Sequence, residues 1–317
     1  MIVKNKDISG AGHTAMKDRW QQFVLQLQDE ICGSLEQMDG KAKFVEDRWD
    51  RPEGGGGLSK VIEDGKVFEK GGVNSSAVYG ELPVAMQQAF GVGDSRFFAC
   101  GLSLVIHPRN PYLPTVHANW RYFELYGRDG SRVDSWFGGG SDLTPYYLFK
   151  EDGRHFHRTL KAAMDPFGEE LYPKYKQHCD EYFVNKHRNR EARGIGGVFY
   201  DYLRPKDASE AERLFSFQQA NGHAFLPAYL PIAARRKDLP YGEREKEWQE
   251  IRRGRYVEFN LIHDRGTLFG LKTNGRTESI LMSLPPRARW VYNYQPEAGS
   301  PEAELVEYLK PRDWVSE

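Results

Sequence analysis

Apolar side chains recur every three or four positions near the start of the chain, which is the spacing of one helical face. They are Trp20, Phe23, Val24, Leu27, Ile31 and Leu35. Gly40 is expected to end this helix. Further helices are predicted over residues 151–164, 168–190, 208–237, 241–253 and 301–309, the last capped by Ser300. Because proline removes a backbone donor, we expect a break in the 208–237 helix at Pro227 and Pro231, and another at Gly222.

Other stretches carry apolar residues without a helical polar stripe, and these are predicted strands. The strongest are residues 97–107 and 116–125, joined by a stiff loop that contains three prolines. Asp64-Gly65 predicts a hairpin turn between residues 60–63 and 66–68. Weaker strand predictions fall on residues 198–203, 256–262 and 267–272, the last two as a hairpin. Since strands and helices do not alternate regularly, we expect a single α+β domain over residues 14–317, after a flexible segment 1–13.

The two strongest strands place polar side chains on one face, because successive residues of a strand point to opposite sides. That face carries Ser103, Val105 and His107 from the first strand, and His117, Asn119 and Arg121 from the second. Trp120 belongs to the opposite face. Such a row of polar groups fits a binding site, but it also fits the solvated face of an antiparallel sheet.

Three further segments have both a functional and a structural interpretation. Asp142 follows three glycines at 138–140, which allow close approach of a ligand but are also typical of a flexible loop. The cations at residues 186–193, Arg193 included, would hold an acidic substrate or end a helix. Asp264 and Arg276 fall in predicted turns, which are common for structural reasons alone.

Composition excludes several classes of protein. The chain of 317 residues has 44 basic and 45 acidic residues, and this balance argues against a general nucleic-acid binder. Cys32, Cys100 and Cys179 are odd in number and far apart, which fits a reducing compartment and neither a disulfide framework nor a Cys-ligated cluster. No apolar segment is long enough to span a bilayer, and residues 1–7 hold no apolar signal core. We therefore expect a cytoplasmic protein, or a stromal one after removal of a transit segment.

Long, ordered and dispersed motifs identify a family resemblance. Residues 71–76 (GGVNSS), 103–123 (SLVIHPRNPYLPTVHANWRYF), 136–145 (WFGGGSDLTP), 254–266 (GRYVEFNLIHDRG) and 279–286 (SILMSLPP) resemble the oxygen-dependent coproporphyrinogen-III oxidase family. The resemblance runs from about residue 14 to the C-terminus. It implies a large antiparallel sheet between layers of helices. It also implies a homodimer with an interface at about residues 256–290. The implied reaction converts two propionates of coproporphyrinogen III into vinyl groups and gives protoporphyrinogen IX for haem or chlorophyll synthesis.

The resemblance also implies roles for particular residues. His117 corresponds to a proton donor, and Asp142 and Asp264 to acidic residues acting on pyrrole nitrogens. The implied substrate contacts are Ser103, Asn119, Trp120, Arg121, Arg193, Asn274, Gly275 and Arg276. The implied divalent-metal ligands are His107, His117, His157 and His187. From spacing alone, no compact motif among the nine histidines fixes a metal site.

The expected chemistry needs dioxygen as co-substrate and no flavin, haem or iron–sulfur cluster. A substrate with four carboxylates requires a broad apolar pocket with arginines at its rim. Two alternatives remain open at this point: a non-catalytic tetrapyrrole carrier, and a metal-dependent hydrolase that uses the histidines. Incubation with coproporphyrinogen III, with and without air, separates them, because only the oxidase releases carbon dioxide.

Overall fold

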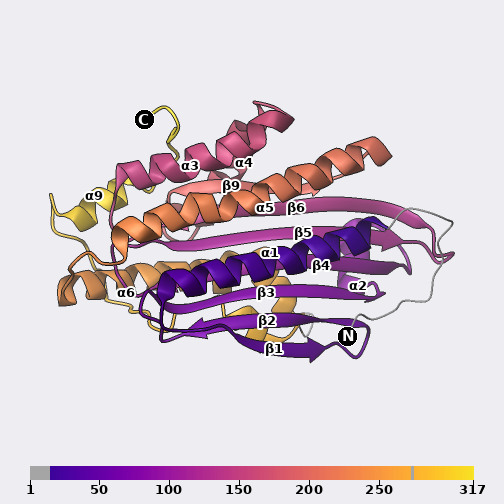
Figure 1. Ribbon diagram of the computed structural model, residues 1–317, viewed down its shortest axis with the longest axis horizontal. Helices are drawn as coiled ribbons and strands as arrows, with labels where there is room; N and C mark the ends of the chain where they lie inside the picture. Colours follow the sequence, from indigo (N-terminus) through magenta and orange to yellow (C-terminus); the bar gives the residue numbers. More distant parts are fainter. Residues whose placement is uncertain (1–14, 273–274) are drawn as a thin grey trace.

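A seven-stranded antiparallel sheet forms the centre of the part of the chain that the computed structural model describes, residues 15–272 and 275–317 (Figure 1). Its strands, in spatial order, are β1 (Val45–Asp50), β2 (Gly55–Glu63), β3 (Phe68–Glu81), β4 (Arg96–Pro108), β5 (Thr115–Tyr126), β6 (Arg132–Thr144) and β9 (Gly196–Leu203). A separate two-stranded hairpin consists of β7 (Val184–Asn185) and β8 (Glu191–Ala192). The predicted α+β fold with a large antiparallel sheet is confirmed.

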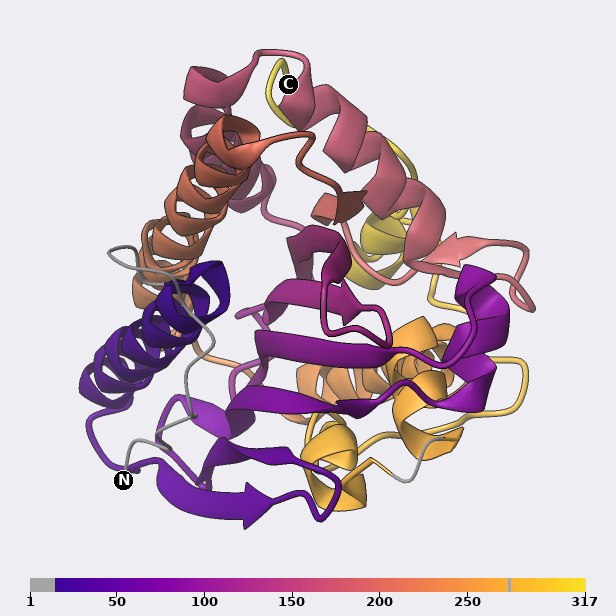
Figure 2. The ribbon, with the colours of Figure 1, turned by 90° about the vertical axis from the view of Figure 1, so that its right-hand side faces the viewer.

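Helices cover both faces of this sheet (Figure 2). The long helices α1 (Met16–Asp39) and α5 (Ala208–Arg236) lie along one face, while α6 (Glu243–Glu258) and the short helices after it lie against the other. The remaining helices are α2 (Val84–Phe90), α3 (Lys150–Met164), α4 (Leu171–Tyr182), α7 (Arg265–Lys272), α8 (Thr277–Leu281) and α9 (Pro301–Tyr308). Within the described ranges, no helix combines the length and hydrophobicity needed to cross a membrane.

Aromatic side chains fill the layer between α1, α5 and the sheet. Trp20 is fully buried there, and its Nε1 donates to the Cys100 carbonyl oxygen on β4 at 2.9 Å. Trp120 of β5 is also buried in this layer, with its ring centroid 6.2 Å from that of Phe225. Because these apolar side chains occupy the face of the sheet under α1 and α5, the polar side chains of the same strands point to the opposite face. On that face Ser279 of α8 hydrogen-bonds to the Ser59 hydroxyl of β2 at 2.9 Å.

Several sequence-based elements are confirmed. Gly40 ends α1 with a φ of 71°, and Ser300 caps α9 by accepting from the Ala303 amide at 3.2 Å. The predicted strands at 97–107 and 116–125 fall within β4 and β5. The hairpin across Asp64 joins β2 to β3, although its turn spans residues 64–67 and not two residues.

The predicted break in the helix at 208–237 is wrong. α5 runs without interruption through Gly222, Pro227 and Pro231. Because Pro231 has no amide hydrogen, it leaves the carbonyl of Pro227, four residues earlier, without its helical donor. His155 of α3 hydrogen-bonds to that oxygen through Nε2 at 2.9 Å. A neighbouring helix therefore replaces the missing bond, which local sequence patterns do not reveal.

Two other predictions of secondary structure are also wrong. Residues 256–272 are helical except at Asp264: α6 continues as a π-helix, η2 (Phe259–His263), and α7 follows after the extended Asp264. Their burial follows a helical period, because Tyr256, Phe259 and Asn260 are buried while Leu261 and Ile262 are exposed. The helix predicted over 168–190 ends at Tyr182, so residues 186–190 form a hairpin turn and not a basic helix end. Positive φ angles at Asn189 (50°) and Arg190 (61°) make this turn.

Candidate active site

The register of the central strands brings the predicted polar side chains onto one face. Ser103 on β4 lies opposite Asn119 on β5, and His117 lies opposite Asp142 on β6. The stretch of residues 136–144 is thus a buried central strand and not the flexible loop that its three glycines also allowed. Asp142 is held in place by hydrogen bonding to strands on both sides. The alternation-based prediction of a shared polar face is confirmed.

Asp142 stands at the centre of a buried polar chain. Its Oδ1 bonds to Nδ1 of His117 at 2.7 Å, and its Oδ2 accepts from Nη2 of Arg193 at 2.6 Å. Arg193 also donates through Nη1 to Oδ1 of Asn260 at 3.2 Å, and its guanidinium lies 4.1 Å from the Phe183 ring centroid. Burial alone would raise the pKa of Asp142, but Arg193 and His117 hold the pKa of this carboxyl below its ordinary value. The charged carboxylate therefore fixes the orientation of the imidazole.

A second group of charges lies on the same face beside β9. Arg121 donates through Nη1 to Oδ1 of Asn119 at 2.5 Å and pairs through Nη2 with Asp201 at 3.1 Å. Arg265 also reaches Asp201, at 4.0 Å. The guanidinium of Arg121 lies across β6 at Gly138, where an added Cβ would come within 2.8 Å of Nε. Among the described residues, Asp201 is thus the one carboxylate that forms an ion pair with either arginine.

Asp264 is a structural cap as well as a candidate acid–base group. Its Oδ1 accepts from the Tyr182 hydroxyl at 2.9 Å, and its Oδ2 accepts from the Thr267 amide at 2.7 Å. The second contact satisfies a free amide of the first turn of α7. Since each carboxylate oxygen has two lone pairs, both oxygens keep the capacity to accept another hydrogen bond.

An aromatic cluster connects these groups. Tyr182 and Phe199 stack with ring centroids 4.6 Å apart and an interplanar angle of 8°. Phe183 packs edge-on against His117 at 5.8 Å, and Arg121 lies 5.7 Å from the Phe199 ring centroid. Tyr182 carries the hydroxyl that bonds to Asp264. His117, Arg121 and Asp264 therefore contact one set of rings, although they are distant in sequence, and Asp142 is joined to this set through His117 and Arg193.

Some predicted site residues lie elsewhere. The Trp120 side chain points into the core on the other face of the sheet, so a ligand on the polar face meets only its backbone. Arg276 lies over the far edge of the sheet, where it pairs with Asp47 of β1 and donates to Ser279 at 3.2 Å. Gly275 donates its amide to the Gly270 carbonyl at 2.8 Å. Asn274 lies outside the described residues.

The four histidines of the implied metal site have separate partners. His107 bonds to Thr115 and to the Ser283 carbonyl, and His157 bonds to Tyr172 and to the Ile195 carbonyl. Burial lowers the pKa of His157 to about 3 and holds the pKa of His107 well below its ordinary value.

A neutral imidazole that donates to a carbonyl and accepts from a hydroxyl has no lone pair left for an ion. Both ring nitrogens of His187 also have partners, the Glu258 carboxylate and Nε2 of His263. Among residues 15–272 and 275–317, no group of three His, Cys, Asp or Glu side chains is arranged to hold a metal. The side chains present therefore do not fit a shared ion.

A cavity of about 940 Å³ lies between α4, the β7–β8 hairpin and residues 309–316. Cations on its wall include Lys176, Arg190 and Arg312. Of the predicted site residues that the structure describes, only Asp142 lines this cavity. This cavity is therefore not the expected arginine-rimmed pocket around all the candidate residues, because only Asp142 reaches it. His117, Asn119 and Arg121 lie half-buried on the sheet face.

Sequence reasoning missed Asp201, Arg265, Tyr182 and Asn260. A signal existed for Asp201, because period-2 alternation along the strand at 198–203 places it on the same face as Phe199. Arg265 adjoins the predicted Asp264 but lay in a segment read as a β-turn. Tyr182 is the last residue of α4, in a helix predicted to continue to residue 190. Asn260 lies where a strand is predicted, so its facing could not be deduced.

The fold and this site define an α+β protein that presents acid–base groups and arginines around aromatic rings, an arrangement suited to a large anionic organic ligand. Comparison with known protein families matches residues 19–314 to the family described as coproporphyrinogen III oxidase. The match covers nearly the whole chain, so the protein belongs to the coproporphyrinogen III oxidase family. Membership supports an oxidoreductase of porphyrin biosynthesis and implies coproporphyrinogen III as its substrate.

Proposed function

We propose that this protein uses dioxygen to convert two propionate side chains of coproporphyrinogen III into vinyl groups, giving protoporphyrinogen IX for haem or chlorophyll synthesis. The observation that carries the proposal is the gathering of His117, Asp142, Arg121 and Asp264 around one aromatic cluster, in a chain of this family. Each propionate loses carbon dioxide and two electrons. With one proton taken up, dioxygen becomes hydrogen peroxide, so atoms and charges balance.

The site has the features that a tetrapyrrole with four carboxylates requires. Among the described residues, Arg121 and Arg265 form ion pairs only with Asp201, so N–H groups of both guanidiniums remain to hold a propionate. The rings of Tyr182 and Phe199 offer an apolar surface beside these cations. We infer that Ser103 and Asn119, which lie on adjacent strands of the same face, hydrogen-bond to a second part of the substrate.

In the proposed mechanism Asp264 removes a pyrrole N–H proton, and the electron-rich ring then reacts directly with dioxygen. The resulting peroxide takes a hydrogen from the propionate β-carbon, and loss of carbon dioxide leaves the vinyl group. His117, oriented by Asp142, is the proposed proton donor. Since the four histidines do not converge, no step is assigned to a metal.

The spacing of the cysteines supports dioxygen as the oxidant. An oxygen-independent enzyme for this conversion requires a cluster on closely spaced cysteines. Here Cys32, Cys100 and Cys179 are each buried and far apart in sequence. Purified protein should therefore release carbon dioxide from coproporphyrinogen III in air, and release none without oxygen.

The base role of Asp264 can be separated from its capping role. Asparagine is as good an N-cap as aspartate but a far weaker base. Asp264→Asn should keep the fold and bind substrate while the rate of carbon dioxide release falls by orders of magnitude. Asp264→Ala should show the same loss together with about 1 kcal/mol lower stability. Turnover at the wild-type rate by the Asn variant would rule out Asp264 as the base.

We further propose a cytoplasmic or stromal homodimer that uses about residues 256–290. This segment exposes large apolar side chains, because Ile262 is 52% and Trp290 is 55% exposed. Sedimentation of the wild-type chain should give twice the chain mass, and Ile262→Glu should shift the equilibrium toward one chain. A wild-type monomer at micromolar concentration would contradict the dimer without affecting the assigned chemistry.

A further inference from the structure

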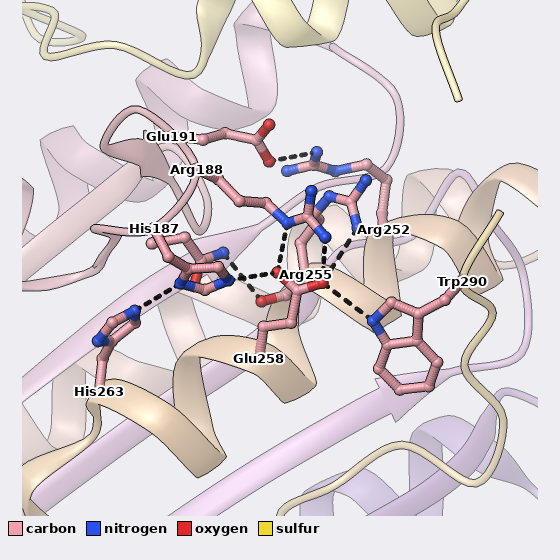
Figure 3. A network of polar contacts seen from close by, with 9 residues as sticks. His187, Arg188, Glu191, Arg252, Arg255, Glu258, His263 and Trp290 are labelled. Atoms are coloured by element: carbon pink, nitrogen blue, oxygen red, sulfur yellow. Dashed lines mark hydrogen bonds and ion pairs between the residues drawn. The ribbon is translucent and has the colours of Figure 1, made fainter. Parts of the chain in front are cut away.

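Glu258, the last residue of α6, receives donors from three separate segments of the chain (Figure 3). Its carboxylate bonds to Nε2 of His187 at 2.9 Å and accepts from Arg188 at 2.5 and 2.7 Å. Arg255 on the preceding turn donates at 3.2 Å, and the Trp290 indole donates at 2.9 Å. Despite these charges the residue is only 8% exposed. No part of the proposed chemistry uses this cluster.

The Glu258 contacts are part of a longer attachment between one face of α6 and the β7–β8 hairpin. Arg252 pairs with Glu191 at 2.6 Å, and the Arg255 carbonyl accepts from Nδ2 of Asn185 at 3.0 Å. Residues 252, 255 and 258 are three apart, so they lie along one side of the helix. The hairpin is therefore held at both of its strands and at its turn, and Glu258 binds the turn.

The two elements joined here lead to Arg193, which bonds to Asp142, and to Asn260, which accepts from Arg193. Arg193 follows β8 directly, and Asn260 lies two residues after Glu258 in the π-helix η2. Arg193 donates to Asn260 at 3.2 Å and to Asp142 at 2.6 Å. A π-helical turn often marks a functional position, because its wider turn moves side chains away from regular helical placement. The attachment at Glu258 thus joins the hairpin that precedes Arg193 to the helix that leads into Asn260.

We propose that Glu258 is a positioning residue for the proposed reaction, acting through the β7–β8 hairpin to hold Arg193 against Asp142 and thereby to orient His117. The inference rests on the proposed function. Glu258 itself contacts none of the polar side chains on the sheet face. A displacement of about 1 Å in a catalytic group can cost on the order of a hundredfold in rate. We therefore expect a loss in kcat and little change in KM, because Asn119 and Arg121 are held by the sheet.

The test compares Glu258→Gln with Glu302→Gln. Glu302 is a matched control, because it is 3% exposed and accepts from Arg244 at 3.0 and 2.8 Å, but it lies in α9, outside the site. Both variants should lower the melting temperature. Only Glu258→Gln should lower kcat, by about 10- to 100-fold with KM within threefold. Glu258→Asp, which keeps the charge, should recover part of the loss.

An Arg193→Lys background provides the decisive comparison. If Glu258 acts through Arg193, adding Glu258→Gln there should lower kcat less than twofold further. Independent, multiplying losses would overturn the inference, and so would equal kcat values in Glu258→Gln and Glu302→Gln.

Hydrogen–deuterium exchange of the peptide 184–196 tests the attachment without turnover. It should be faster in Glu258→Gln and unchanged in Glu302→Gln, and equal rates would refute the positioning role. A wild-type chain that releases no carbon dioxide would instead refute the proposed function and leave the exchange result to decide on Glu258.

Discussion

Replacing Asp142 by asparagine should destabilise the protein strongly, because it removes the counter-charge of a buried arginine. Arg193 is 3% exposed, and Asp142 is its only anionic hydrogen-bond partner among the described residues. Breaking a buried ion pair by removing one member costs about 3–5 kcal/mol. The rings of Phe183, Tyr256 and Phe259 around the guanidinium retain some stabilisation, so we expect the lower end, about 3 kcal/mol.

The magnitude translates into a measurable shift. At about 2.1 cal/mol/K per residue, a chain of 317 residues has an unfolding entropy of about 0.7 kcal/mol/K, so 3 kcal/mol lowers the melting temperature by about 4 °C. Urea denaturation followed by circular dichroism gives the free energy of unfolding directly. The single variants Asp142→Asn and Arg193→Met should each be less stable than the wild type.

The double variant tests the reasoning itself. Removing both members of a buried pair leaves no uncompensated charge, so Asp142→Asn with Arg193→Met should be more stable than the sum of the single losses by about 2 kcal/mol or more. Additive losses would show that the two side chains do not stabilise each other as a pair. The explanation of Asp142 as the charged centre of the site would then be wrong.

Three further outcomes are expected. The Arg253 guanidinium holds the pKa of Glu69 below its ordinary value despite burial, so its stabilisation is present above about pH 4 and lost as the pH falls through the folded-state pKa. Glu69→Gln should therefore flatten the fall in unfolding free energy below pH 4, and an unchanged slope would contradict this. His155→Ala should lower the free energy of unfolding by about 1 kcal/mol in the wild type and clearly less in Pro231→Ala, where the helix regains its own donor. Equal losses would show that the His155 bond does not replace the missing helical bond to the Pro227 carbonyl. Finally, because all three thiols are buried, alkylation of the native protein should be slow and should become complete on unfolding, as mass spectrometry can show.

The sheet could be predicted from sequence where side-chain alternation was strong. Residues 117–121 alternate between polar and apolar, and residues 103–107 do so except at Val105. Their shared face is confirmed by the pairing of Ser103 with Asn119. Glycines at 138–140 have no strand preference, and that stretch is a strand because β5 and β9 bind it from both sides. Pairing between distant segments is not encoded in the local pattern, so the sequence alone left this point open.

The site was predictable in part for the same reason. His117 and Asp142 meet through strand register, but Arg193 reaches them from a hairpin where the sequence predicts the end of a helix. Residues 256–272 were read as strands because short apolar runs do not distinguish strand from helix. Asn260 and the capping role of Asp264 therefore became visible only with the π-helix and α7 in place.

Gly138 controls an ion pair without carrying any charge. An added Cβ at this position would lie 2.8 Å from Nε of Arg121 and 2.9 Å from Oδ1 of Asp201, inside the space that the two groups occupy. One methyl group there would push the guanidinium off β6 and separate it from its carboxylate. The absence of a side chain at Gly138 thus lets Arg121 on β5 reach Asp201 on β9 across the strand between them. Replacing the glycine would separate this ion pair while leaving every ionisable residue of the protein in place.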